Sequence, residues 1–114
     1  MPKLAMDAVR RSNRFRVIMN LPLRIGLKNG TLVDISSAGI LATHTGVLKL
    51  EALVEISFQS GDEKFTAKAR VASCTVVGLG AGEGGATLYA SRLYFTDLPD
   101  ESKRLLESLV GQES

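Results

Sequence analysis

Two groups of polar residues near the start of the chain have the types and spacing needed to bind a nucleotide. The first group is Arg10, Arg11 and Arg14. Guanidinium groups make planar, bidentate hydrogen bonds to phosphates and to the O6/N7 edge of guanine. Arg10 and Arg14 are four positions apart, which places them on the same side of a helical or an extended chain. The group is therefore a candidate site for phosphate and guanine.

The second group lies in the segment DISSAG, which contains Asp34, Ser36 and Gly39. A carboxylate at Asp34 can accept hydrogen bonds from N1–H and N2–H of guanine, the edge that arginine does not contact. Residues two apart on a strand share a face, so if Val33 and Ile35 face the core, the two polar side chains face outward. Gly39 suits a positive φ, or a close approach that a Cβ would obstruct. A plain hairpin turn would explain fewer of these features, and the arginines favour a guanine pocket.

The composition indicates one globular domain. The chain has 114 residues, 45% of them hydrophobic, which is enough for a core without metals or disulfides. No apolar run approaches the roughly 18 residues of a membrane span, and residues 1–16 are too charged for a signal peptide. We therefore expect a cytoplasmic protein with no membrane span.

The residues of common catalytic and metal sites are scarce. Cys74 and His44 are the only cysteine and the only histidine, which excludes an internal disulfide and a zinc site of the His/Cys type. Asp34, Ser36 and His44 are the residue types of a hydrolase triad, but Ser36 lacks the G-x-S-x-G elbow and His44 is expected in a polar loop. We expect no enzyme, no catalytic residues, no metal and no cofactor.

Charge and hydrophobic period divide the chain in two. Residues 1–30 carry seven Lys/Arg and one Asp, a net +6, whereas the rest carries seven basic and eleven acidic residues, a net −4. Residues 1–16 have no clean hydrophobic period and are predicted to form a flexible basic arm that attracts anions. A barrel domain is predicted over 17–114.

The domain is predicted to be all-β with a C-terminal helix. Period-two alternation and turn residues indicate six strands, at 17–27, 31–36, 39–44, 53–59, 64–77 and 87–95. The first strand is expected to place Leu27 on its core face, and Asn29-Gly30 is expected to form the first hairpin turn. A helix is predicted at about 99–110, from Pro99 near its start and an apolar stripe. Short, regular strand spacing favours a six-stranded antiparallel barrel.

A glycine-rich segment, residues 78–85, contains the pattern G-x-G-x-x-G. That pattern holds a dinucleotide pyrophosphate only where it follows a strand and opens a helix. A strand is predicted to follow it here, so we interpret the segment as a hairpin loop.

The segment RRSNR from Arg10, followed after nineteen residues by DISSAG from Asp34, resembles the R-x-x-x-R and D/N-x-S-x-x-G signature of PilZ domains. The resemblance covers essentially the whole chain. It implies a six-stranded β-barrel with a C-terminal helix that binds the bacterial second messenger cyclic di-GMP, often as a stacked pair of molecules. Some PilZ domains carry an aromatic residue on the fifth strand near the ligand, where Ser73 is expected in this chain.

By position, the resemblance assigns contacts to phosphate and guanine to Arg10 and Arg14, with Arg11 assisting. It gives guanine and nearby polar groups to Asp34 and Ser36, and the shape of the turn to Gly39. The arm would fold over the ligand and present a changed surface to a downstream protein, which the sequence does not identify.

Two other functions are compatible with parts of the sequence. A PilZ-like adaptor would bind a protein partner without nucleotide, but such members usually lack the arginine motif. A single-stranded nucleic-acid binder would combine a basic arm with a small barrel. That class usually needs aromatic stacking platforms, yet aromatic residues make up only 5% of the chain and tryptophan is absent, so nucleic acid is not the expected partner.

Overall fold

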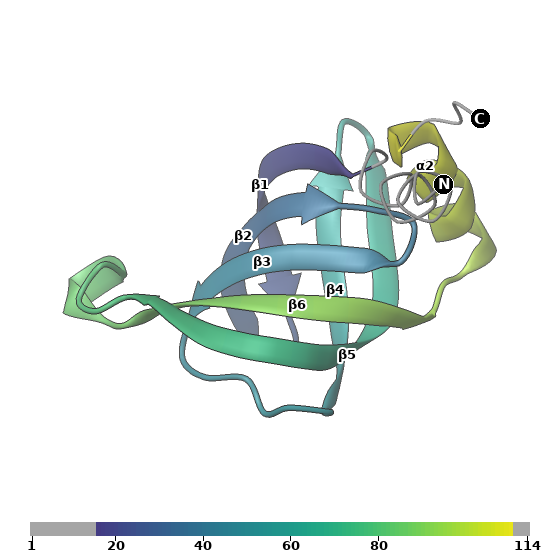
Figure 1. Ribbon diagram of the computed structural model, residues 1–114. Coiled ribbons are helices and arrows are strands. Elements are labelled where there is room, and N and C mark those ends of the chain that lie inside the picture. The colour runs from purple at the N-terminus through teal and green to yellow at the C-terminus, as the bar shows by residue number, and fades with distance from the viewer. Residues whose placement is uncertain (1–15, 111–114) are drawn as a thin grey trace, which may run out of the picture.

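A computed structural model describes residues 16–110, which form a closed barrel of six antiparallel strands followed by one α-helix (Figure 1). Neighbouring strands around the barrel follow the order β1-β2-β3-β6-β5-β4. The predicted six-stranded barrel with a C-terminal helix is confirmed. The elements are β1 Val17–Ile25, β2 Lys28–Ile35, β3 Gly39–Thr45, β4 Leu53–Ser60, β5 Glu63–Gly78, a short 3-10 turn Glu83–Gly85, β6 Leu88–Asp97 and α2 Asp100–Val110.

The core lies inside the barrel and is built from alternate residues of every strand. Ile25, Leu32, Ile40, Phe65 and Leu93 each expose 2% of their surface or less. Burying an aliphatic or aromatic side chain of this size contributes about 1.5–3 kcal/mol. Because most inward positions are apolar, the intervening outward positions are available for a binding surface.

The first hairpin turn lies earlier than predicted. Ile25 pairs with Lys28, so the two-residue loop is Gly26-Leu27 and the prediction of a turn at Asn29-Gly30 is wrong. Gly26 has φ +60°, and a glycine with positive φ at the first loop position matches the twist of a hairpin. Leu27 is 92% exposed, because it lies at the tip of the turn and not on the core face of β1.

An irregularity in β2 decides which side chains face the core. The pairing of β2 with β3 shifts register between Leu32 and Asp34, and the bulge lets Leu32 and Ile35 both become fully buried. Val33 is only half-buried, so the condition that Val33 and Ile35 both face the core is not met. Asp34 pairs with Leu41, a position between inward residues, and is therefore on the outer face.

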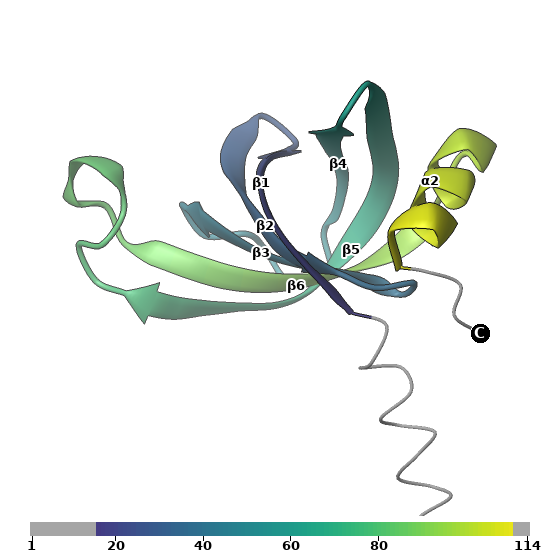
Figure 2. The same cartoon turned by 90° about the horizontal axis from the view of Figure 1, so that it is seen from above.

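Helix α2 lies against β5 outside the barrel (Figure 2). Asp100 and Glu101 lie in its first turn, where negative charge is favoured by the helix dipole. Ser102 and Leu106 are its buried residues, and the Ser102 hydroxyl accepts a hydrogen bond of 3.1 Å from the backbone N–H of Thr66. No helix within residues 16–110 is long and apolar enough to cross a membrane.

His44 lies in β3 and is only 2% exposed, so the expectation that it lies in a polar loop is wrong. Its Nδ1 donates to the Gly46 carbonyl at 2.9 Å, so its Nε2 accepts from the Ser91 hydroxyl at 2.7 Å. Tyr89 stacks on the imidazole, with ring centroids 6.0 Å apart. Ser91 is fully buried, which gives this pair a structural role in the β3–β6 wall.

Ser91→Ala is expected to lower the free energy of unfolding by about 1–3 kcal/mol, because it leaves a buried imidazole nitrogen without its donor. Urea denaturation measures the change. Ser73→Ala, at an exposed position of β5, is the matched control and should stay within about 0.5 kcal/mol of the wild type. Equal stability of both variants would contradict the structural role of the pair.

Candidate functional site

Asp34 lies near the end of β2 and is only 5% exposed although it faces outward. Its Oδ1 lies 3.7 Å from Nε of Arg16, the residue that precedes β1. That separation makes an ion pair but is longer than a hydrogen bond, and an ionised carboxylate offers about four acceptor positions. Within residues 16–110, Asp34 is therefore a partly desolvated carboxylate whose ion pair with Arg16 leaves acceptor positions for other donors.

The DISSAG segment is a tight connection between β2 and β3. Ile35 pairs with Ile40, and the backbone N–H of Ser36 donates to the Gly39 carbonyl at 2.9 Å. The Ser36 hydroxyl accepts from the backbone N–H of Ala38 at 3.2 Å. This bond helps to fix the shape of the turn. Because Ser36 is only half-buried, its hydroxyl also lies close to the surface.

Gly39 is required by the approach of two strands. It opens β3, opposite Tyr94 of β6, and a Cβ at this position would collide with the backbone carbonyl of Leu93. Its φ is not among the positive values. Of the two reasons that the sequence suggested for a glycine, the close approach is therefore correct. The same turn is tied to β6 by a bond of 2.9 Å from Phe95 N–H to the Ala38 carbonyl.

The strand register extends the outer face of Asp34 across four further strands. Adjacent pairs link it to Ile18 of β1 and Leu41 of β3, then to Arg92 of β6 and Ser73 of β5. Neighbouring strands lie about 4.8 Å apart, so the backbone of Arg92 lies two strands away from that of Asp34. A carboxylate and a guanidinium thus lie on the same face, close enough for one nucleotide to contact both.

Arg92 and Tyr94 are candidate site residues that sequence reasoning missed. Tyr94 is 43% exposed and pairs with Arg70 of β5, whose Nε lies 3.6 Å from a carboxylate oxygen of Glu51. Within residues 16–110, no carboxylate lies within ion-pair distance of Arg92. The alternation in SRLYF, with Leu93 buried, was the available signal that Arg92 and Tyr94 point outward.

The structure brings Asp34, Ser36 and Gly39 together at the β2–β3 turn. The predicted ligand contacts of Arg10, Arg11 and Arg14 lie outside the described residues. Ser73 stands where some PilZ domains have an aromatic residue. Ser73 pairs with Arg92 of β6, and the aromatic residue Tyr94 follows two positions after Arg92. Among residues 16–110, no three His, Cys, Asp or Glu side chains are grouped so that they could hold a metal ion.

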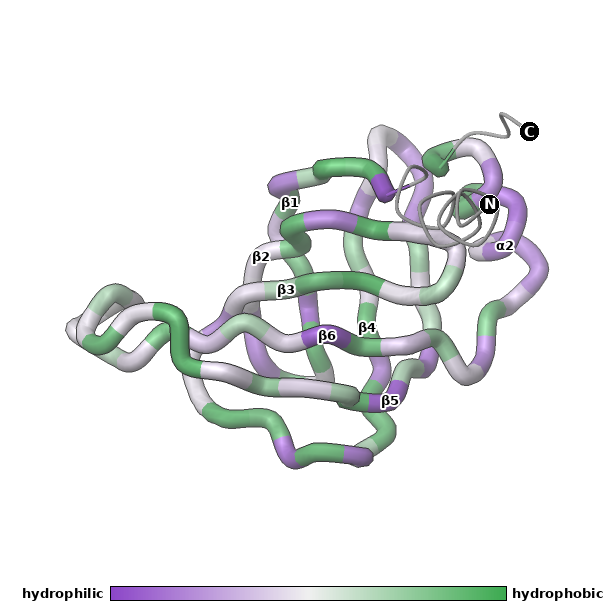
Figure 3. Tube along the Cα trace, viewed as in Figure 1, coloured by the Kyte–Doolittle hydropathy of each residue, from purple (hydrophilic) through white to green (hydrophobic). Residues whose placement is uncertain are grey.

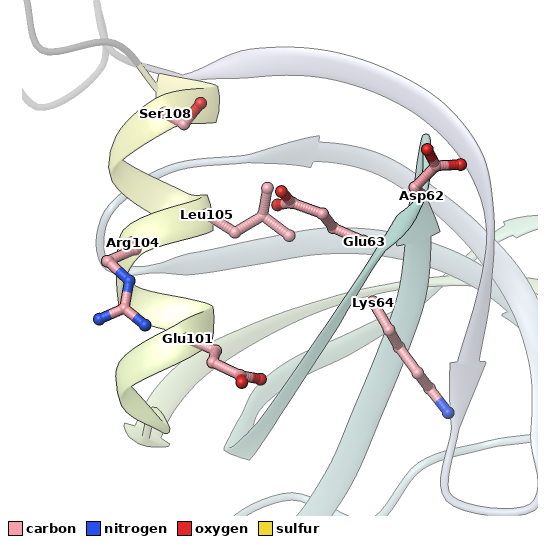
Figure 4. A pocket seen from close by; sticks show the side chains of 7 residues that line it. All are labelled: Asp62, Glu63, Lys64, Glu101, Arg104, Leu105 and Ser108. Carbon is pink, nitrogen blue, oxygen red and sulfur yellow. The ribbon is translucent and has the colours of Figure 1, made fainter.

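A hollow lies elsewhere, between α2 and the β4–β5 hairpin (Figure 4). Its volume is about 610 Å³. It has acidic, basic and neutral walls, because its lining residues are Asp62, Glu63, Lys64, Glu101, Arg104, Leu105 and Ser108. Nearly all of these side chains are exposed, and the mixed charge does not select a phosphate. Size alone therefore does not make this cleft the ligand site.

A closed six-stranded barrel with a C-terminal helix and a polar turn on its outer face defines a small β-barrel domain. The family model of the PilZ domain matches residues 8–112. The chain therefore belongs to the PilZ domain family, and the resemblance inferred from its motifs is confirmed. PilZ domains are generally non-catalytic receptor domains of the cyclic di-GMP-binding family. No curated protein matches the chain.

Proposed function

We propose that this chain is a cytoplasmic, non-catalytic receptor for cyclic di-GMP. In this proposal the ligand lies over the outer face of β2, β3 and β6, and the basic arm closes over it. The ordered arm then presents a changed surface to a downstream protein. The observation that carries the proposal is the outward but almost buried carboxylate of Asp34 at the point where the arm joins the barrel.

The short separation in sequence between the arginine motif and Arg16 supports a role for the arm. Arg16 lies beside Asp34, and Arg14 is two residues earlier. An extended chain spans at most about 3.6 Å per residue, so the Cα of Arg14 must lie within about 7 Å of that of Arg16. From there the side chain of Arg14 is long enough to reach a ligand at Asp34. Arg10 lies four residues earlier, so it can contact a more distant part of the same ligand. The arginine motif and the carboxylate can therefore contact one ligand.

The charges on the barrel support an anionic guanine ligand. Asp34 can accept from guanine N1–H and N2–H, while Arg92 offers a guanidinium to a phosphate or to guanine O6/N7. The ring of Tyr94 can stack on a base, which typically contributes about 1–3 kcal/mol. A pair of stacked ligand molecules would extend from Asp34 towards Arg92.

Calorimetric titration of the full chain with cyclic di-GMP tests the proposal. We expect saturable heat, with a stoichiometry that distinguishes one bound molecule from two. Bound ligand should also protect the arm from cleavage by trypsin at Arg10, Arg11 and Arg14. No heat with wild-type protein at ligand concentrations in the tens of micromolar, which correspond to about −6 to −7 kcal/mol of binding, would refute a receptor function and favour a nucleotide-independent adaptor.

Arg92→Ala is expected to weaken cyclic di-GMP binding about tenfold or more, because a hydrogen bond to a charged group contributes about 1.5–3 kcal/mol. The measurement is the same titration. Arg24→Ala is the matched control, since Arg24 is exposed near the β1–β2 turn and pairs with Ser57 of β4 on another part of the barrel. An equal loss in both variants would indicate a general effect of charge and would contradict a local contact at Arg92.

A further inference from the structure

The β5–β6 hairpin projects far beyond the barrel, and one edge of β5 is left without a partner strand (Figures 1 and 2). β6 pairs with β3 as far as Leu88, but β4 pairs with β5 only as far as Arg70. A loop then continues on this edge, with bonds of 2.8 and 3.0 Å between Val71 and the backbone of Glu51 and Ala52. In the described part of the chain, backbone hydrogen bonds on this edge end there, and the loop runs beside the strand only as far as Cys74. Residues 75–78 therefore form an open strand edge.

The open edge has an irregularity between Val76 and Gly78, but it lacks the charges and prolines that commonly prevent strands from pairing between molecules. Natural edge strands carry lysines, prolines or inward charges that discourage such pairing. Between Arg70 and Glu83 the chain has neither a charged residue nor a proline. Thr75, Val76 and Val77 are all exposed, and their β-branched side chains favour a strand. The edge is thus chemically suited to accept another strand.

Exposed apolar side chains gather along the same edge. Of the nine large hydrophobic residues that are exposed within residues 16–110, five lie here: Val47, Leu50, Val76, Val77 and Leu79. Val47 and Leu50 belong to the β3–β4 loop. This loop runs beside β5, and its Leu48 N–H lies 3.5 Å from the Cys74 sulfur. Apolar segments on the hairpin and on this loop are visible in Figure 3. The edge therefore has apolar surface on both the strand and the loop beside it.

We propose that the chain forms a homodimer in which the open edges of two β5 strands pair antiparallel about a two-fold axis. An unpaired strand edge offers N–H and C=O groups that a second strand satisfies. Because residues 71–82 carry no charge, pairing between two copies of this edge places no like charges opposite each other. A charged strand of another protein would find no opposite charge on this edge. Two-fold pairing also closes the assembly, since each copy covers the other's open edge.

The flanking apolar residues account for the stability of such a dimer. Specific interfaces usually bury about 1,200–2,000 Å² in total, more than the pairing of two short strand edges supplies by itself. Val47 and Leu50, which are 64% and 57% exposed, lie beside the edge and would contribute the additional area. This inference goes beyond ligand binding and does not depend on it.

Sedimentation equilibrium of the full chain over a concentration series tests the proposal. We expect the wild type to be a dimer and Val77→Lys to be a monomer, because the substitution places like charges near the two-fold axis. Leu27→Lys is the matched control. It makes the same kind of change at the tip of another hairpin, where Leu27 is 92% exposed, and should leave the dimer intact.

A second measurement locates the contact. In a Cys74→Ser background, single cysteines at Val76 and at Leu27 are compared for disulfide-linked dimers after mild oxidation. We expect cross-linking at Val76 and little at Leu27. A wild type that remains monomeric up to its solubility limit, an undiminished dimer in Val77→Lys, or equal loss in Leu27→Lys would each overturn the proposal. Association only with a different protein would overturn it as well.

Discussion

Asp34→Ala is expected to weaken cyclic di-GMP binding by about 100-fold or more. The carboxylate can accept two hydrogen bonds from one guanine, and each bond to a charged group contributes about 1.5–3 kcal/mol. Asp34 is only 5% exposed, so water screens these bonds less than it would on an open surface. Calorimetric titration of both proteins under the same conditions measures the loss.

The shape and the charge of Asp34 can be separated. Asp34→Asn keeps the shape of the side chain but provides one acceptor and adds a donor, which opposes the guanine N–H groups. It is therefore expected to lose nearly as much affinity as the alanine variant. Asp97→Ala, at an exposed acidic position at the end of β6, is the control for net charge and should bind as the wild type does.

Loss of stability would be a different result from loss of the ligand contact. Asp34 pairs with Arg16, whose side chain remains 33% exposed, so Arg16 can be solvated by water when its partner is removed. Thermal unfolding of the Asp34 variants should accordingly stay close to that of the wild type. An unchanged affinity in a folded Asp34→Ala protein would contradict the assignment of this residue to the ligand site.

Gly39→Ala is expected to destabilise the fold by at least about 3 kcal/mol, the upper part of the range for overpacking and for single substitutions in general. A Cβ at this position would collide with the backbone carbonyl of Leu93 in β6. Backbone inside a paired sheet cannot move away as the end of a flexible side chain can. The substitution must therefore separate β3 from β6 at the turn that carries the site. Urea denaturation measures the effect.

Gly61→Ala is the informative comparison for Gly39. Gly61 lies in the β4–β5 turn with φ +61°, and a Cβ there would meet nothing within 4 Å. Its substitution is expected to cost about 1 kcal/mol, from backbone conformation alone. If Gly39→Ala were the milder of the two variants, the close approach of β6 would not be what requires the glycine.

Local sequence patterns predicted much of this fold. Period-two alternation identified all six strands, because a strand with one buried face must place apolar residues at every second position. The last helix was evident from its apolar stripe and its acidic first turn. The grouping of Asp34 and Ser36 at one turn followed from their separation by a single residue, which is a property of the local chain.

The errors arose where long-range pairing chose between local alternatives. Both Gly26-Leu27 and Asn29-Gly30 can form a tight turn, and the register of β1 against β2, with Ile25 opposite Lys28, selects the first. His44 was expected in a polar loop, although it ends the predicted strand at 39–44. In the barrel it is buried by β6, where Ser91 satisfies its Nε2. Neither outcome is encoded in the few residues around the turn or the histidine.

The sequence by itself determined the family, the barrel class and the presence of a D-x-S-x-x-G turn, since motifs and alternation are properties of neighbouring residues. Only the tertiary structure decided which distant residues share the face of that turn. The bulge after Leu32 and the register of β3 against β6 place Arg92 in line with Asp34. The extra length of β5 beyond β4 leaves an open edge. Pairing between strands far apart in the chain fixes these positions, and no local pattern specifies it.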